Sequence, residues 1–192
     1  MIQWIDESLD RLGVERAAFV GASMGTWMAT RYAIARPDRV ERLALVGPSG
    51  IVSSLRTGWL LRAFTDVIFR PSSAKIEAFV ESLVAPETRK RMRTDPWHQS
   101  VQLMILGIGT FRRGLREPLP LRCNVEPLAD SGIPVLAIIG REEALHDGPK
   151  MAERFRQRLP GVQVRLLDDA NHLVFIDQQE LVAEELRTFL GQ

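Results

Sequence analysis

Residues 17–36 read AAFVGASMGTWMATRYAIAR, and this stretch decides the fold. Its first four residues form a short apolar run, which is typical of a buried strand. From Met24 onward the residues are rich in alanine and methionine, and the run closes before Pro37, so the pattern predicts a helix. Ser23 stands between the two, with one glycine two positions before it and another two positions after it. The stretch therefore predicts a serine on a sharp turn from a strand into a helix.

This serine turn matches the pattern G-x-S-x-G, in which the serine is a nucleophile. The backbone of such a turn is strained, and glycines such as Gly21 and Gly25 let the neighbouring chain pass close by. Because the serine stands at a helix N-terminus, the Met24 N–H and the helix dipole are placed to stabilise a negative oxygen. We expect Ser23 to be the nucleophile and Met24 to supply an oxyanion N–H.

Further apolar runs along the chain predict buried strands over residues 43–46, 134–139 and 162–167. The spacing of apolar residues predicts helices over residues 2–12, 24–36, 150–159 and 178–190. Strands that are apolar throughout and alternate with helices are typical of a parallel sheet covered on both faces. The sequence therefore predicts an α/β fold, with a mostly parallel sheet flanked by helices.

The middle of the chain has a different texture, with helical spacing and many bulky side chains but no clear strand. Helices inserted between two halves of a parallel sheet indicate a cap. The aromatic residues of this cap include Trp59, Phe64, Trp97 and Phe111. They suggest that any small molecule bound beneath the cap has an apolar acyl or alcohol portion, although aromatic residues at helical spacing more often belong to a core. We therefore expect residues 1–50 to form the first part of the core, 51–123 the helical cap, and 124–192 the rest of the core.

Composition excludes several other classes of protein. The 192 residues include 25 Lys and Arg against 24 Asp and Glu, which leaves no electrostatic reason to expect nucleic acid or a membrane surface as partner. The single cysteine, Cys123, cannot form an internal disulfide, and no paired-cysteine metal signature is present. The first residues lack the basic start and apolar run of a signal peptide, and no apolar stretch is long enough to cross a bilayer. We expect a cytoplasmic protein without a metal or cofactor.

The chain has three histidines, so the candidates for a general base are few. His98 falls within the expected cap, where a packing or surface role is more typical, and His146 lies in a polar loop without a positional signature. His172 follows the last predicted strand, and the ends of parallel strands are where such sheets place their chemistry. It also follows both Ser23 and an acidic loop, which is the chain order serine, acid, histidine of enzymes with this turn. We expect His172 to be the base.

The acid should come from the loop that follows the predicted strand 134–139, which reads GREEALHD over residues 140–147. A carboxylate there would accept the imidazole N–H, fix the tautomer and balance the charge that forms on the ring. The residues of this loop leave three candidates open: Glu142, Glu143 and Asp147.

With these residues in place, the sequence resembles the α/β-hydrolase superfamily over nearly its whole length. GASMGTWMATRYAIARPDRVERLALVGPSG, residues 21–50, is similar to the serine turn, helix and next strand of that family, and residues 134–190 are similar to its C-terminal third. In the family the acid usually stands three residues after the strand-ending glycine, most often as Asp. The resemblance therefore implies Ser23, Glu143 and His172 as the triad, with Glu in place of the usual Asp.

Within the superfamily, carboxylesterases are the comparison that fits best. The segment LVGPSG, residues 45–50, is also similar to hydrolases that cleave C–C bonds in ring-fission products. Those enzymes commonly place a Trp two positions after the histidine, where this chain has Val174.

Members of the superfamily usually have several strands before the nucleophile, whereas one predicted helix and one predicted strand precede Ser23. The resemblance implies that four early strands and the loop with the second oxyanion N–H are missing. We therefore expect an N-terminally truncated hydrolase whose serine strand lies at an exposed edge, through which two copies can pair. Loss of one oxyanion donor predicts turnover lower by about 10²–10³-fold.

Together these observations predict a serine hydrolase that cleaves small, largely apolar carboxylic esters or related acyl compounds through an acyl-enzyme. Its partner would be a small ester-like molecule. Two alternatives stay open. One is a catalytically impaired remnant of such an enzyme, with a binding role or none, and the other is a C–C bond hydrolase.

Overall fold

The computed structural model describes residues 1–63, 65, 72–91, 99, 102–103, 106–107, 110 and 123–192. Phe64, Trp97, His98 and Phe111, four of the residues considered above, lie outside the described residues.

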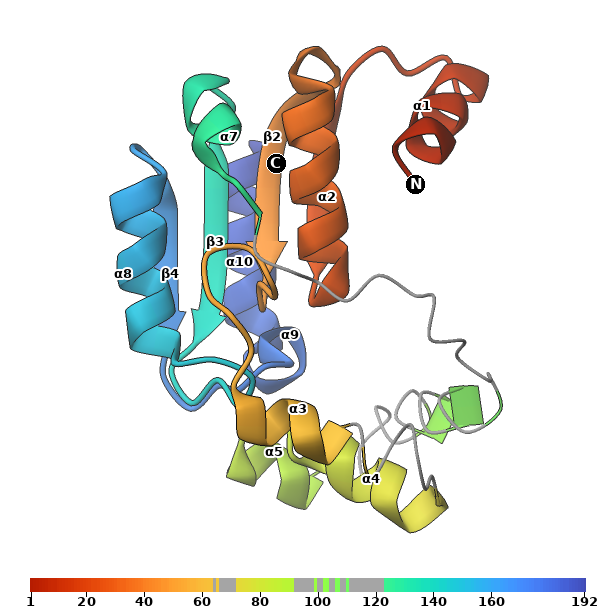
Figure 1. Cartoon of the computed structure of the whole chain (residues 1–192), viewed down its shortest axis with the longest axis vertical. Helices are drawn as coiled ribbons and strands as arrows, with labels where there is room; N and C mark the ends of the chain where they lie inside the picture. Colours follow the sequence, from red (N-terminus) through yellow and green to blue (C-terminus); the bar gives the residue numbers. More distant parts are fainter. Residues whose placement is uncertain are drawn as a thin grey trace.

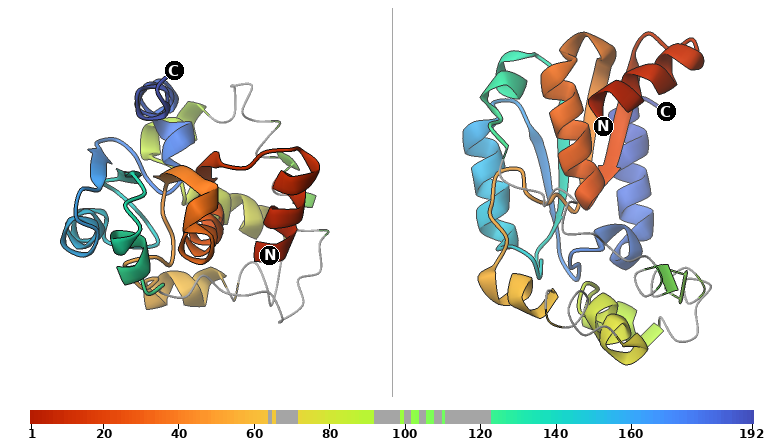
Figure 2. Two further views of the ribbon diagram at one scale, coloured as in Figure 1. Left: turned by 90° about the horizontal axis from the view of Figure 1, so that it is seen from above. Right: turned by 45° about the vertical axis from the view of Figure 1, so that its right-hand side comes forward.

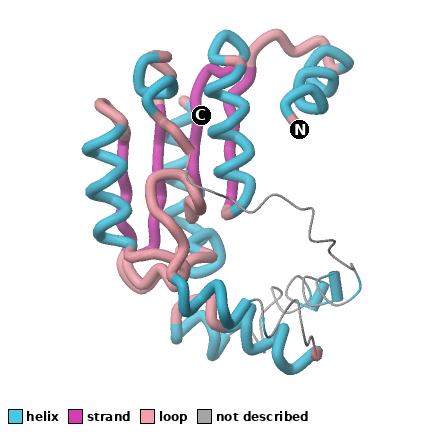
Figure 3. The backbone as a smooth tube through the Cα atoms, in the orientation of Figure 1, coloured by secondary structure: helices cyan, strands magenta, loops and turns pink. Residues whose placement is uncertain are grey.

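Four strands form one sheet in the order β1-β2-β3-β4, and every neighbouring pair is parallel (Figures 1 and 3). The strands are β1 (Ala17–Ala22), β2 (Val40–Val46), β3 (Val135–Gly140) and β4 (Gln163–Leu167). The predicted α/β fold with a parallel sheet is therefore confirmed. β2 begins three residues earlier than its apolar run, because Val40 already pairs with Ala17 of β1.

The helices predicted over residues 2–12, 24–36, 150–159 and 178–190 are present, with bounds that differ from the predicted ones by at most two residues. In chain order the described helices are α1 (Ile2–Arg11), α2 (Met24–Ala35), the short 3-10 helix η1 (Pro37–Arg39), α3 (Thr57–Ala63), α4 (Ser73–Glu81), α5 (Pro86–Arg91), α7 (Glu126–Asp130), α8 (Gly148–Arg158), α9 (Val174–Asp177) and α10 (Gln179–Leu190).

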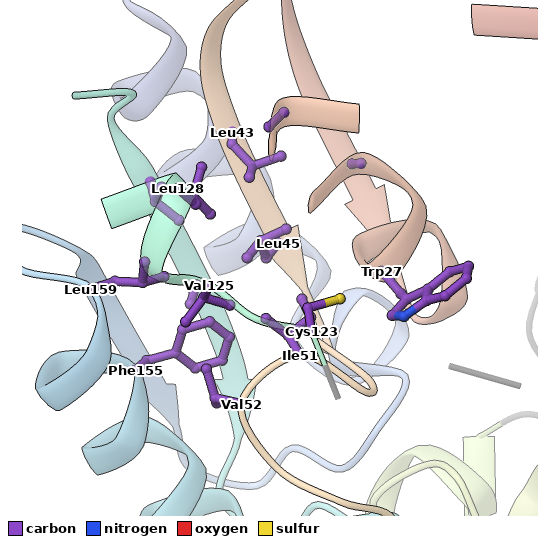
Figure 4. Packing of buried hydrophobic residues seen from close by; sticks show 14 of the residues in the cluster. Trp27, Leu43, Leu45, Ile51, Val52, Cys123, Val125, Leu128, Phe155 and Leu159 are labelled. Atoms are coloured by element: carbon purple, nitrogen blue, oxygen red, sulfur yellow. The ribbon is translucent and has the colours of Figure 1, made fainter. Parts of the chain in front are cut away.

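Helices cover both faces of the sheet, because side chains along each strand point alternately to opposite sides. On one face Leu43 and Leu45 of β2 pack under α2, α7 and α8, as Figure 4 shows from close by. The helices α9 and α10 lie on the other face (Figure 2). Ala44 of β2 and Leu136 of β3 pack against them in one apolar cluster. Burial of each leucine side chain contributes about 1.5–3 kcal/mol. β3 is buried along its whole length, which accounts for its uniformly apolar sequence.

The N-terminal helix α1 lies against α2 through polar and apolar contacts. The Tyr32 hydroxyl donates to Asp6 Oδ1 at 2.8 Å, and Arg36 Nε donates to the other oxygen of the same carboxylate at 3.0 Å. Burial and the hydrogen bond to Asp6 raise the pKa of Tyr32 to about 12. Ile5 and Leu9 of α1 pack against the same apolar cluster as α2.

The helices α3, α4 and α5 come between β2 and β3 in the chain, and they lie at the end of the sheet toward which the strand arrows point (Figure 1). This segment packs on the loops that follow β3 and β4 through an apolar cluster, whose buried members are Ile76, Phe79, Val80, Leu83, Val84, Leu145, Leu173 and Ile176. Trp59 joins it with its ring 5.5 Å from that of Phe79. The division of the chain at residues 50 and 123 stays a prediction.

In the described part of the chain, every helix falls short of the length and apolar character needed to cross a membrane.

β1 forms one edge of the sheet, since β2 is its neighbour on one side only. Its residues are alternately exposed and half-buried up to Gly21, and Val20 is 48% exposed. The backbone N–H and C=O groups of an edge strand invite pairing with another strand.

We propose that two copies of the chain pair through β1. The chain is then expected to self-associate in analytical ultracentrifugation, and Val20→Lys is expected to weaken that association, because lysine on an edge strand discourages pairing. Leu181→Lys is the matched control, since Leu181 on α10 is 47% exposed. Equal association of the two variants, or a monomer at every concentration, would contradict the proposal.

Candidate active site

Ser23 connects β1 to α2 in a backbone conformation that few residues other than glycine adopt. Its φ is 49° and its ψ is −118°, and such a conformation typically costs about 1–3 kcal/mol. Gly21 makes the turn possible, because a Cβ at this position would lie 2.5 Å from the carbonyl oxygen of Gly25. A Cβ on Gly25 would meet no described atom within 4 Å. Of the two glycines of the serine pattern, Gly21 therefore has the close approach that was predicted for both, and Gly25 does not.

Hydrogen bonds hold the serine turn to the end of β2. The Ser23 N–H donates to the carbonyl of Val46 at 3.0 Å. The buried Thr26 hydroxyl donates to the Ser23 carbonyl at 2.5 Å and accepts from the Ser49 N–H at 3.1 Å. Sequence reasoning missed Thr26, although a hydroxyl in the first turn of a helix is a usual partner for local backbone groups.

Two hydrogen bonds connect Ser23, His172 and Glu143, which come from distant parts of the chain. Ser23 Oγ lies 2.8 Å from His172 Nε2, and His172 Nδ1 lies 2.9 Å from Glu143 Oε2. His172 and Glu143 are each 2% exposed. A neutral imidazole donates from one nitrogen and accepts at the other. With the Nδ1 proton donated to the carboxylate, Nε2 is free to accept the serine proton.

Of the three acidic candidates, the structure brings only Glu143 to the histidine among the described contacts. Its second oxygen, Oε1, accepts from the Leu145 N–H at 2.8 Å, which fixes the carboxylate. Glu142 is exposed. Asp147 caps the N-terminus of α8, where it accepts from the Lys150 N–H at 3.1 Å.

The loop that carries His172 lies directly on the ends of two strands. A Cβ on Gly140, the last residue of β3, would overlap the carbonyl oxygens of Asn171 and Ala170. A Cβ on Gly47, just after β2, would overlap the carbonyl oxygen of His172. The absence of side chains at these two positions therefore sets how close the imidazole comes to the sheet.

Comparison with known proteins shows the family. The family described as alpha/beta hydrolase fold matches residues 1–179. The chain belongs to this family. Three relatives are similar over more than nine-tenths of this chain. Carboxylesterase YbfK of Bacillus subtilis is 25% identical over 197 residues, which cover 98% of this chain and 62% of the relative. Pimeloyl-[acyl-carrier protein] methyl ester esterase of Vibrio campbellii is 26% identical and covers 91% of this chain and 70% of the relative. 2-Hydroxymuconate semialdehyde hydrolase of Pseudomonas putida is 25% identical, with coverages of 99% and 69%.

The crystal structure of carboxylesterase CesB (YbfK) from Bacillus subtilis superimposes with a TM-score of 0.82 at 22% identity. The match covers 98% of this chain and 65% of that one, so the chain spans just under two-thirds of the length of this relative. The likeness supports the same fold.

Met24 is the first residue of α2, so its backbone N–H has no acceptor within the helix. That N–H lies in the residue next to Ser23, at the positive end of the helix dipole. Its role as an oxyanion donor stays a prediction. Within the described ranges, no three His, Cys, Asp or Glu side chains are arranged to hold a metal ion.

His146 is a buried neighbour of Glu143, whereas the sequence assigned it only to a polar loop without a positional signature. It is 1% exposed, and its Nδ1 lies 3.0 Å from the carbonyl oxygen of Ser54, to which it donates. Its Nε2 has no hydrogen-bond partner among the described residues. Burial lowers the pKa of His146, with the charges of His172 and Arg56 acting in the same direction and Glu143 against it. The folded state therefore favours neutral His146.

This preference makes the free energy of unfolding depend on pH. Unfolded His146 takes up a proton as the pH falls below 6.5, whereas the folded state resists it because its pKa is lowered. Stability from this residue is thus present above pH 6.5 and is lost as the pH falls toward the folded pKa. His146→Asn keeps a donor for Ser54 but cannot titrate, so it should lose less stability on acidification in urea unfolding. Parallel losses in the two proteins would contradict the assignment.

Proposed function

We propose that this chain is a serine hydrolase of small, largely apolar carboxylic esters or related acyl compounds. The observation that carries the proposal is the continuous pair of hydrogen bonds from Ser23 Oγ through His172 to Glu143, at 2.8 Å and 2.9 Å. A serine hydroxyl is a weak nucleophile. It is activated when a base lies within hydrogen-bonding reach and a third group orients that base.

The reaction follows from this geometry in two halves. His172 Nε2 takes the proton of the Ser23 hydroxyl while Oγ attacks the ester carbonyl, and the carbonyl oxygen becomes an oxyanion near the Met24 N–H. The bond to the leaving alcohol then breaks, and His172 returns the proton to that alcohol, which leaves an acyl group on Ser23. In the second half His172 deprotonates water, which attacks the acyl carbonyl, and the free acid leaves as Ser23 regains its proton.

Glu143 contributes by holding the imidazole through this cycle. Its carboxylate accepts the Nδ1 proton and stabilises the imidazolium that forms when Nε2 is protonated. Both residues are buried, so water screens this interaction little. The Leu145 N–H on its other oxygen keeps the carboxylate in one orientation.

The proposed substrate class rests on the surroundings of the triad and on the relatives. Leu145 and Leu173, which lie close in sequence to Glu143 and His172, belong to the apolar cluster formed with α4. An apolar cover favours an apolar acyl or alcohol group. The names of two relatives, a carboxylesterase and a methyl ester esterase, support ester cleavage.

A C–C bond hydrolase is the second candidate, favoured by the similarity to 2-hydroxymuconate semialdehyde hydrolase. Val174 stands where C–C bond hydrolases commonly place a Trp, and this difference favours ester hydrolysis as the function. A panel of nitrophenyl esters and ring-fission products separates the two, since the preferred class should be hydrolysed with the higher kcat/KM.

The proposed roles predict which variants react with a fluorophosphonate probe, which labels an activated serine. Wild type is expected to be labelled on one residue, and Ser23→Ala should abolish the label. His172→Gln should slow labelling by about 10²–10⁴-fold, the usual contribution of a general base. Peptide mapping by mass spectrometry checks both.

The half-buried Ser8 donates its hydroxyl within α1 to the Trp4 carbonyl, so Ser8→Ala is a control expected to keep the wild-type rate. A label on another residue would sink the assignment of Ser23. No label at all would favour the non-catalytic remnant.

A further inference from the structure

Asn171 directly precedes His172, and its buried side chain uses every hydrogen-bonding position that an amide has. Its Oδ1 accepts from the His172 N–H at 2.7 Å and from the Ala144 N–H at 2.8 Å. Its Nδ2 donates to the carbonyl of Ser82 at 3.1 Å and to that of Val84 at 3.3 Å. A side-chain amide has two acceptor and two donor positions, so this one is fully satisfied.

The carbonyl end of Asn171 joins the two halves of the acid–base pair. Ala144 follows Glu143 in the chain, and the His172 N–H belongs to the base itself. A single oxygen atom therefore holds the backbone beside both groups. A shift of either backbone segment changes the 2.9 Å separation of His172 Nδ1 and Glu143 Oε2.

The amide end of Asn171 belongs to a continuous row of bonds to residues 82–85, the segment that connects α4 to α5. Between the two bonds from Nδ2, the Leu173 N–H donates to the carbonyl of Leu83 at 2.9 Å. The row ends at Asp177, whose Oδ1 accepts from the Ala85 N–H at 2.9 Å. All four residues of the segment are therefore bonded either to the loop that carries the base or, through Asp177, to the helix α9 that follows it.

Asp177 also fixes the backbone of Asn171. Its Oδ2 accepts from the Asn171 N–H at 2.7 Å, and the Thr88 side chain hydrogen-bonds the same carboxylate. Asp177 is 8% exposed. Because one buried carboxylate accepts from both Asn171 and Ala85, the backbone of the base loop and that of residues 82–85 are fixed to each other.

We propose that Asn171 is the positioning residue of the acid–base pair: its Oδ1 sets the separation of Glu143 and His172, and its Nδ2 docks residues 82–85 on the same loop. The inference rests on the proposed function, because the separation affects a reaction only if the pair activates Ser23. Asn171 suits the position better than any acidic residue, since a carboxylate would turn an oxygen toward the carbonyls of Ser82 and Val84.

Two substitutions separate the two ends of the amide. Asn171→Ala removes all four bonds, whereas Asn171→Asp keeps an acceptor for the Ala144 and His172 N–H groups and loses both donors. The matched control is Asn124→Asp, because Asn124 is the other asparagine of the chain and is exposed. The rate of fluorophosphonate labelling of Ser23 is measured in each.

Misplacement of a catalytic group by about 1 Å can cost about 100-fold in rate. The proposal therefore predicts labelling slower by about 10–100-fold in Asn171→Ala, by less than about tenfold in Asn171→Asp, and unchanged in Asn124→Asp. Equal losses in the two Asn171 variants would overturn it, because they would mean that the side chain serves only to dock residues 82–85. If Asn171→Ala does not fold, a loss of about 100-fold in Asn171→Asp overturns it as well.

A second measurement separates failure of this inference from failure of the proposed function. The proton between His172 Nδ1 and Glu143 gives a strongly deshielded imidazole resonance in NMR, which requires no substrate. We expect it in wild type, Asn171→Asp and Asn124→Asp, and we expect it to shift or vanish in Asn171→Ala. An unlabelled wild type with this pattern would refute the hydrolase and support the positioning role. A resonance unchanged in folded Asn171→Ala would refute the positioning role alone.

Discussion

The loop that carries His172 rests on the bare backbone at the ends of β2 and β3. Neither Gly47 nor Gly140 has room for a Cβ, since the carbonyl oxygens of residues 170–172 occupy that space. This close approach places the imidazole next to the serine turn, where His172 Nε2 lies within hydrogen-bonding distance of Ser23 Oγ. The strained backbone of Ser23 places the serine hydroxyl opposite that nitrogen. The site therefore depends on two backbone features, of which one is costly and the other needs glycine.

The segment that covers the sheet end is part of the same arrangement. Residues 82–85 are bonded to the base loop through Asn171, Leu173 and Asp177, and the Arg56 N–H donates to the carbonyl of Leu145 at 2.8 Å in the acid loop. Apolar packing between α4 and both loops surrounds these bonds. Buried polar groups of this kind are costly to leave unpaired, at about 1–3 kcal/mol each. A substitution that breaks these bonds is therefore expected to disturb residues 82–85 and the triad together.

Much of this could be predicted from the sequence, because the strong signals were local. The apolar runs gave the four strands, and Ser23 stands in a five-residue pattern with a strand before it and a helix after it. His172 was selected by chain order, and Glu143 was selected from three candidates by the resemblance to the α/β-hydrolase family. In the structure His172 lies within hydrogen-bonding distance of both Ser23 and Glu143. Their catalytic roles stay predictions.

What could not be predicted depends on contacts between distant segments. Thr26, Asn171 and Asp177 each form at least one hydrogen bond with a backbone group more than 20 residues away in the chain. Nothing in the sequence around these three residues indicates those distant partners. The sequence predicted that Gly140 follows a strand, but it did not show why this position must be glycine. The reason is that the loop at residues 170–172 packs against it and leaves no space for a side chain.

The most direct test of this account is the rate at which a fluorophosphonate labels Ser23 in Gly140→Ala, measured on protein whose circular dichroism matches wild type. The added methyl group must push the base loop away, so the account predicts labelling slower by about 10-fold or more. Gly58→Ala is the control, because a Cβ on that α3 residue meets no described atom within 4 Å, and its rate should equal that of wild type. Labelling of Gly140→Ala at the wild-type rate would contradict the claim that the bare strand end places the base.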